Sequence, residues 1–209
     1  MIVKVCGMRD ADNIREVESL GIDWMGFIFY PPSKRFVGEH APSYLPERCS
    51  RVGVFVNAEP GYIRSMVPLF GLDAIQLHGN ESPDFCRELA SREPGIRLIK
   101  AFSLSDPADI GKTAGYEGIV DCFLFDTPTS GFGGSGRTFD WTLLDGYHGH
   151  TPFLLSGGLG PESIDELKGF SHPQWIGIDL NSRFETAPAL KDTKALRSFL
   201  EQVRTDKKE

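Results

Sequence analysis

The sequence is poor in cysteine, and the few cysteines that it has are widely spaced. Cys6, Cys49, Cys86 and Cys122 are the 4 cysteines among 209 residues, and no two of them form a C-x-x-C pair. This spacing fits neither a disulfide framework nor a zinc site, because zinc needs clustered Cys and His ligands. We therefore expect free thiols in a reducing compartment and no bound metal.

Basic charge and long apolar runs are also scarce. Lys and Arg number 22 against 29 Asp and Glu, which gives a net charge of -7, so no nucleic-acid partner is expected. The first apolar run spans only about five residues, too few for a signal-peptide core or a membrane span. We expect a cytoplasmic protein without a membrane partner.

Two nucleotide-binding motifs are missing as well. No G-x-G-x-x-G follows the first apolar run, and no G-x-x-x-x-G-K-[ST] occurs. Any phosphate would therefore be held by a different local site.

What the chain does contain is enough apolar material for a large core, since 40% of its residues are hydrophobic. Short runs rich in Val, Ile, Leu and Phe alternate with segments of helical periodicity, the first of them over 12–20, and no Pro/Gly/Ser-rich linker divides the chain. We predict one domain over residues 1–204 and a polar tail over 205–209.

The fold prediction depends on the number of strand-like runs. Strict alternation of strand and helix predicts parallel strands with both faces covered, and closing eight of them gives a single-domain (β/α)8 TIM barrel. An open doubly wound sheet gives the same alternation, but the strand count favours the barrel. After the second run, four prolines predict a long loop with room for only a short helix. The eight runs cover residues 2–6, 25–29, 51–56, 74–78, 97–102, 119–126, 152–156 and 175–179.

Barrels of this kind place their active sites at the C-terminal ends of the strands, where Cys6 and Asp126 end two of the runs. Alternation along a strand puts Cys6 on the same face as Lys4, whose charge would lower the thiol pKa. The apolar residues 123–125 would raise the pKa of Asp126 and let it donate a proton. A base and an acid across one pocket suit a proton-shifting isomerase. The alternatives are a packed cysteine and a helix-capping aspartate.

Two glycine-rich segments follow the sixth and seventh runs. GFGGSGRTFDW (131–141) contains Gly134 and Gly136, and SGGLGPESI (156–164) contains Gly157 and Gly158. Backbone N–H groups exposed by such glycines bind anions, and barrels bind phosphate beside their last strands. Tight turns are the alternative role for these glycines.

Three further polar residues are candidates for binding. Arg35 has a planar guanidinium suited to a carboxylate, although a solvated Lys34–Arg35 pair is the alternative. Gln76 and His78 share a strand face, and His78 is either a pocket hydrogen-bond donor or a structural histidine.

Seven ordered blocks closely resemble the phosphoribosylanthranilate isomerase family of tryptophan biosynthesis. Together they span residues 3–185, which makes the match far more specific than any one block. The blocks are VKVCGM (3–8), GFIFYPPSKRFV (26–37), VGVFVN (52–57), IQLHG (75–79), FDT with GGSGRTFDW (125–127, 133–141), LSGGL (155–159) and GIDLNSRFE (177–185).

The resemblance implies a (β/α)8 barrel that rearranges N-(5′-phosphoribosyl)anthranilate to 1-(o-carboxyphenylamino)-1-deoxyribulose 5-phosphate without a cofactor. It implies that Cys6 is the general base, that Asp126 is the general acid and that Arg35 lies near the anthranilate carboxylate. The small phosphoribosyl substrate is the expected partner, and the chain is expected to be a monomer or a homodimer. The other implied substrate-binding residues are Gly134, Gly136, Gly157, Gly158, Asp179, Asn181 and Ser182.

One block departs from the family pattern, because NSRFE (181–185) stands where many members have SSGVE. Arg183 replaces a glycine there, and it either contacts the phosphate or points to solvent. Another phosphosugar isomerase of the same fold and a catalytically silent phosphosugar-binding barrel are the alternative functions.

Overall fold

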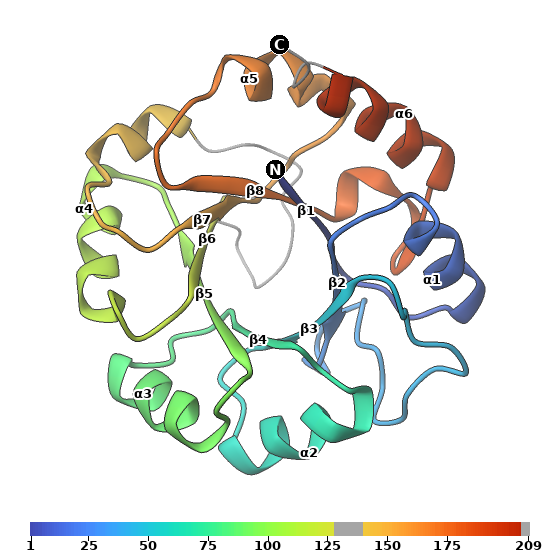
Figure 1. Ribbon diagram of the computed structural model, residues 1–209, viewed down its shortest axis with the longest axis horizontal. Helices are drawn as coiled ribbons and strands as arrows, with labels where there is room; N and C mark the ends of the chain where they lie inside the picture. Colours follow the sequence, from blue (N-terminus) through green and yellow to red (C-terminus); the bar gives the residue numbers. More distant parts are fainter. Residues whose placement is uncertain (128–139, 206–209) are drawn as a thin grey trace.

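The computed structural model of the protein describes residues 1–127 and 140–205, which form a closed barrel of eight parallel strands (Figure 1). Each strand pairs with the next, and β8 pairs with β1, so the sheet is not the open alternative. All eight predicted strands are present. They are β1 Ile2–Val5, β2 Trp24–Ile28, β3 Ser50–Phe55, β4 Ala74–Leu77, β5 Arg97–Ser103, β6 Cys122–Asp126, β7 Phe153–Leu155 and β8 Trp175–Leu180.

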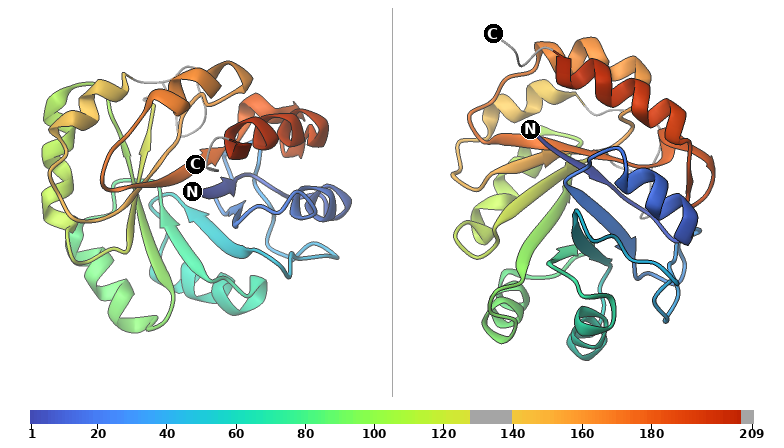
Figure 2. Two further views of the ribbon diagram at one scale, coloured as in Figure 1. Left: turned by 45° about the horizontal axis from the view of Figure 1, so that its top comes forward. Right: turned by 45° about the vertical axis from the view of Figure 1, so that its right-hand side comes forward.

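Helices surround the barrel, as the two views in Figure 2 show. The alternation is less strict than predicted. No helix joins β2 to β3, a 3-10 helix is the described helix between β6 and β7, and a small hairpin follows β8. The α-helices are α1 Ala11–Glu18, α2 Pro60–Phe70, α3 Pro83–Arg92, α4 Pro107–Gly111, α5 Ile164–Gly169 and α6 Thr193–Arg204. The 3-10 helices are η1 Lys112–Tyr116, η2 Trp141–Gly146, η3 Pro161–Ser163 and η4 Ser182–Phe184, and the hairpin strands are β9 Glu185–Ala187 and β10 Leu190–Lys191.

Local sequence signals account for where the longer helices begin and end. The Asp10 carboxylate accepts the N–H groups of Asp12 and Asn13 at the start of α1, and Ser82 accepts that of Phe85 at the start of α3. Gly71 ends α2 in the left-handed conformation, with φ 57°. The polar tail predicted over 205–209 has residues 206–209 outside the described part of the chain.

A long loop, residues 29–49, joins β2 to β3 without any helix, as its prolines predict. The buried Glu18 carboxylate of α1 holds this loop by accepting the hydroxyl of Tyr44 at 2.5 Å and the N–H groups of Glu47 and Arg48 at 2.6 Å each. The predicted start of the sixth strand was wrong. β6 begins at Cys122, because the carboxylate of Asp121 turns to accept the Leu98 N–H at 2.7 Å.

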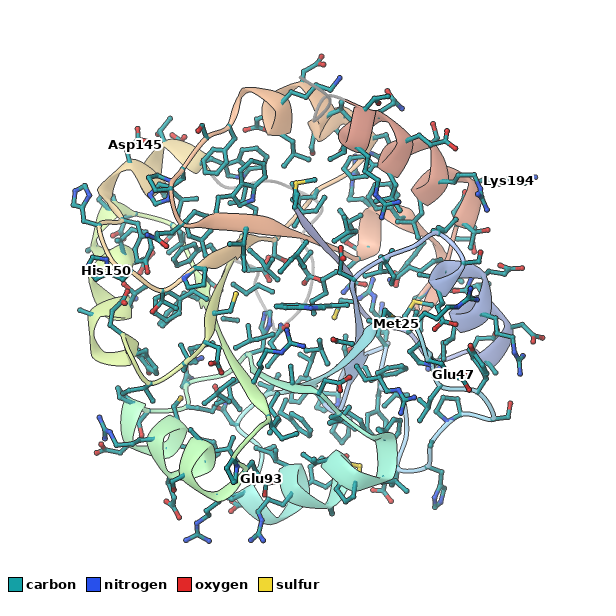
Figure 3. The ribbon with its side chains drawn as sticks, viewed as in Figure 1. Met25, Glu47, Glu93, Asp145, His150 and Lys194 are labelled. Atoms are coloured by element: carbon teal, nitrogen blue, oxygen red, sulfur yellow. The ribbon has the colours of Figure 1, made fainter. Side chains whose placement is uncertain are left out.

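The apolar side chains form two cores. A larger core lies between the strands and the helices, and a smaller one fills the barrel interior. The interior becomes polar towards the C-terminal ends of the strands, where Lys4, Gln76 and Asp179 are buried. Charged side chains such as those of Asp145 and Lys194 lie on the outer rim (Figure 3). The interior members are Trp24, Val52, Ala74, Ile99, Ala101, Cys122, Leu124 and Leu154.

Among the described residues, no helix combines the length and apolar character needed to cross a membrane.

Phe70 tests the outer core. It is fully buried at the end of α2, with its ring centroid 4.7 Å from that of Phe29 and 6.0 Å from that of Phe27. Phe70→Ala should lower the free energy of unfolding by about 3–5 kcal/mol, because it leaves a cavity. The matched control is Leu69→Ala, since Leu69 is 45% exposed and should contribute about 0.5 kcal/mol or less. Urea denaturation measures both, and equal losses would contradict this account of the core.

Candidate active site

A pocket opens at the C-terminal ends of the strands. Of the predicted site residues, Gly134 and Gly136 lie outside the described part of the chain. All the others line this one pocket. They are Cys6, Arg35, Asp126, Gly157, Gly158, Asp179, Asn181 and Ser182, and Ser33, Gln76, His78, Ser156 and Arg183 complete the polar lining.

Cys6 lies directly above a buried ion pair. Lys4 Nζ is 2.9 Å from Asp179 Oδ1, and the side chains of Lys4 and Asp179 are 0% and 6% exposed. The two residues are register partners across β1 and β8, which explains why they meet. Burial acts to lower the pKa of Lys4, but the charge and the hydrogen bond of Asp179 oppose it, and that pKa is raised. Lys4 is therefore a fixed ammonium beneath the thiol.

The expectation that Lys4 makes Cys6 acidic was only partly right. Lys4 does act to lower the Cys6 pKa, by its charge and by a hydrogen bond, but burial is the larger effect and raises that pKa above its ordinary value. The reason is that a 3% exposed thiolate has lost its hydration. Cys6 is therefore a thiol at neutral pH until another positive charge approaches.

Two glycines, which have no side chain, make room for Cys6 and Asp126. A Cβ on Gly26 would lie 2.6 Å from Cys6 Sγ, and a Cβ on Gly157 would lie 2.5 Å from Asp126 Oδ1. Both separations are far below contact distance, so any larger residue would displace these groups. Gly157 also has φ +84°, which favours glycine.

Asp126 stands across the pocket in polar surroundings. Its Oδ1 accepts the Thr127 N–H at 2.8 Å, and its Oδ2 lies 3.3 Å from His78 Nε2. The apolar surroundings predicted for it were wrong, because Phe123 and Phe125 point outward into the larger core. Alternation along β6 predicts this division, since odd and even residues face opposite sides.

His78 has a defined hydrogen-bonding pattern. Gln76 Nε2 lies 2.8 Å from His78 Nδ1. Because an amide nitrogen can only donate, Nδ1 accepts and Nε2 carries the ring hydrogen towards Asp126. His78 therefore is a pocket residue that faces the carboxylate, which the sequence left open.

The loop after β7 forms another wall of the pocket. Gly157 and Gly158 are both left-handed, with φ 84° and 71°, so two successive amides follow Ser156 at the end of the strand. Arg183 lines the same wall and pairs with Glu162 of η3. Arg183 thus lines the pocket with a side chain that is 42% exposed.

Arg35 reaches the pocket from the long loop after β2 and is already bound on one side. Its Nε and Nη2 lie 2.8 and 2.6 Å from the two carboxylate oxygens of Glu185. Lys191 Nζ lies 2.6 Å from Glu185 Oε1. The sequence analysis missed both partners. An arginine gives no local sign of a partner 150 residues away in the chain, and only the acidic end of the NSRFE block was a signal.

No group of three or more His, Cys, Asp or Glu side chains among residues 1–127 and 140–205 is arranged to hold a metal ion.

The ion pair under Cys6 gives a test of its acidity. Lys4→Met removes both the positive charge and the hydrogen bond that act to lower the thiol pKa, so that pKa should rise further. The rate of Cys6 alkylation by iodoacetamide, followed by peptide mass spectrometry, should then increase only at higher pH than in the unsubstituted protein. Cys49 in the same molecule is the internal control, and its profile should not move. A profile for Cys6 that stays in place would show that Lys4 does not act on the thiol.

Comparisons with known proteins agree with this geometry. A family profile described as N-(5′-phosphoribosyl)anthranilate (PRA) isomerase matches residues 3–202. The N-(5′-phosphoribosyl)anthranilate isomerase of Phocaeicola vulgatus is 55% identical, with 98% of each chain covered. That of Parabacteroides distasonis is 52% identical, covering 97% of this chain and 93% of its own.

Solved structures give the same result. The phosphoribosyl anthranilate isomerase of Thermotoga maritima has a TM-score of 0.81 and 34% identity, with 97% of this chain and 98% of its own covered. Another structure of this isomerase, in complex with reduced 1-(o-carboxyphenylamino)-1-deoxyribulose 5-phosphate, has a TM-score of 0.78 and 32% identity over the same shares. From the profile match over residues 3–202 and these identities, the chain belongs to the N-(5′-phosphoribosyl)anthranilate isomerase family.

Proposed function

We propose that the pocket catalyses the Amadori rearrangement of N-(5′-phosphoribosyl)anthranilate to 1-(o-carboxyphenylamino)-1-deoxyribulose 5-phosphate, a step of tryptophan biosynthesis, without a cofactor. The observation that carries this proposal is that a thiol and a carboxyl group, Cys6 and Asp126, face the same pocket from β1 and β6. Family membership supports it, as does the related isomerase that binds a reduced form of the product.

Asp126 acts first, as the general acid. The proposal requires Asp126 to enter this step as the carboxylic acid. It gives its proton to the ribose ring oxygen, the bond between that oxygen and C1′ breaks, and a protonated Schiff base forms at C1′. The Thr127 N–H and His78 Nε2 hold the carboxylate that remains and stabilise its charge.

Cys6 acts second, as the general base. The protonated Schiff base brings a positive charge to the pocket, and this charge adds to that of Lys4 and favours the thiolate. The thiolate takes the proton from C2′, the electrons of that bond neutralise the Schiff base, and an enolamine forms. The enolamine then becomes the ketone by gaining a proton at C1′ and losing the proton of its C2′ hydroxyl group.

The two ends of the substrate are bound by different groups of the pocket. The successive amides of Gly157 and Gly158, with Ser182 and Arg183 beside them, are suited to the phosphate. The guanidinium of Arg35 is suited to the anthranilate carboxylate. In this orientation the sugar carbons C1′ and C2′ lie between Cys6 and Asp126.

Substitution of the two proton-transfer groups tests the proposal. Cys6→Ser and Asp126→Asn should each reduce turnover by about two to four powers of ten, because each removes one proton transfer. The loss of anthranilate fluorescence during the reaction measures turnover. The matched controls are Cys49→Ser and Asp145→Asn, which lie away from the pocket and should keep full activity. Full activity in either pocket variant, with chemistry still rate-limiting, would show that its role is wrong.

Arg35→Ala tests the assignment of the carboxylate. Removing a charge-assisted hydrogen bond should weaken use of the natural substrate by about 1–3 kcal/mol in kcat/KM. The loss should shrink on N-(5′-phosphoribosyl)aniline, an analogue without the carboxylate. An equal loss on both substrates would instead place the action of Arg35 on the loop or on the phosphoribosyl group.

A further inference from the structure

The guanidinium of Arg35 is bound along one edge only. The Glu185 carboxylate accepts hydrogen bonds from Arg35 Nε at 2.8 Å and from Nη2 at 2.6 Å. These two nitrogens form the edge of the guanidinium nearest the aliphatic stem. Among the described residues, Nη1 has no hydrogen-bond partner, so the outer edge formed by Nη1 and Nη2 is left for another acceptor. The Arg35 side chain lines the pocket and is 16% exposed.

Glu185 is itself fixed by Lys191. The side chain of Lys191 is fully buried, and its Nζ lies 2.6 Å from Glu185 Oε1 and 2.7 Å from Asn181 Oδ1. Burial acts to raise the pKa of Glu185, but the hydrogen bonds and charges of Arg35 and Lys191 outweigh it and lower that pKa. The carboxylate is therefore ionised and accepts hydrogen bonds from two cations at once.

Lys191 is held from behind by α1. The Asn13 side chain accepts the Lys191 N–H at 2.7 Å and donates to the Lys191 carbonyl at 3.0 Å, and both contacts are buried. A buried side-chain amide that pairs with a backbone in this way fixes β10 against α1. The chain of contacts thus runs from a helix, through Lys191 and Glu185, to the guanidinium at the pocket.

The stem of Arg35 is fixed as well. A Cβ on Gly7 would lie 2.8 Å from Arg35 Cδ, so the stem crosses the backbone directly after Cys6. An arginine bound at one edge and packed along its stem has lost most of its rotamer freedom before any ligand arrives. This arrangement cuts the entropy lost on binding, which is the general benefit of preorganisation.

We propose that Glu185 and Lys191 are positioning residues that hold Arg35 by its inner edge and present its outer edge to the carboxylate on the aromatic ring of the substrate. The inference rests on the proposed function, because it takes that carboxylate as the ligand of Arg35. The carboxylate of Glu185 and that of the substrate then each bind the same guanidinium through two hydrogen bonds.

Glu185→Gln tests the proposal, because it keeps the size of the side chain and removes its charge. The new amide group also places a donor against Arg35 or Lys191. KM for the natural substrate should rise about 3- to 15-fold with little change in kcat, because the carboxylate is bound equally in the ground and transition states. On N-(5′-phosphoribosyl)aniline, KM should stay within about twofold of the unsubstituted enzyme.

A double-substitution cycle separates positioning from a general structural role. If Glu185 acts only through Arg35, the variant carrying both Arg35→Ala and Glu185→Gln should be no worse on the natural substrate than Arg35→Ala alone. The matched control is Glu93→Gln, which breaks an Arg–Glu contact of similar length, 3.0 Å from Arg64 Nε, at the surface. This control should leave both substrates unaffected. If Glu185→Gln does not fold, Lys191→Met replaces it in the same comparison. It is expected to raise KM for the natural substrate and not for N-(5′-phosphoribosyl)aniline.

The outcomes distinguish the two levels of the proposal. A selective defect in Arg35→Ala, with no selective defect in either Glu185→Gln or Lys191→Met, overturns the positioning role and leaves the carboxylate assignment intact. Losses that multiply in the double variant overturn the positioning role too. An equal loss on both substrates in Arg35→Ala removes the carboxylate assignment and, with it, the inference.

Discussion

The ion pair of Lys4 and Asp179 is the interaction on which the site depends. It joins the first strand to the last at the seam where the barrel closes, and it places an ammonium directly beneath the thiol of Cys6. Burying an unpaired charge at this depth is unfavourable, so loss of either partner destabilises the fold. The same contact therefore joins the two strands that close the barrel and places a positive charge beside Cys6.

Much of the fold was predictable because parallel strands that are buried on both faces are near-continuous apolar runs. The elements that were missed are short. Strands β9 and β10 have three and two residues, too few for any periodic signal, yet they carry Glu185 and Lys191. Ile119 and Val120 were predicted to belong to the sixth strand, but they precede β6. They are apolar because the connection is partly buried, and its composition then resembles that of a strand end.

The site was predictable to the level of its residues and less so to the level of its electrostatics. The position of Cys6 and Asp126 at strand ends follows from alternation. The acidity of Cys6 does not, because the loss of hydration that dominates it depends on packing by other strands. Likewise, the partner of Arg35 stands 150 residues away in the chain, and no local pattern connects them.

The pairing of β1 with β8 has a consequence for how the protein comes into existence during synthesis. Lys4 leaves the ribosome among the first residues, and its partner Asp179 follows 175 positions later. Until then, β1 lacks β8, the strand that closes the barrel. The partners of Arg35 are made later than Asp179, because Glu185 and Lys191 lie beyond the last barrel strand. An incomplete chain thus contains Cys6 and Asp126, but Lys4 still lacks its partner Asp179 and Arg35 still lacks its partner Glu185. The site is therefore complete only when the C-terminal part of the chain packs against the N-terminal strand.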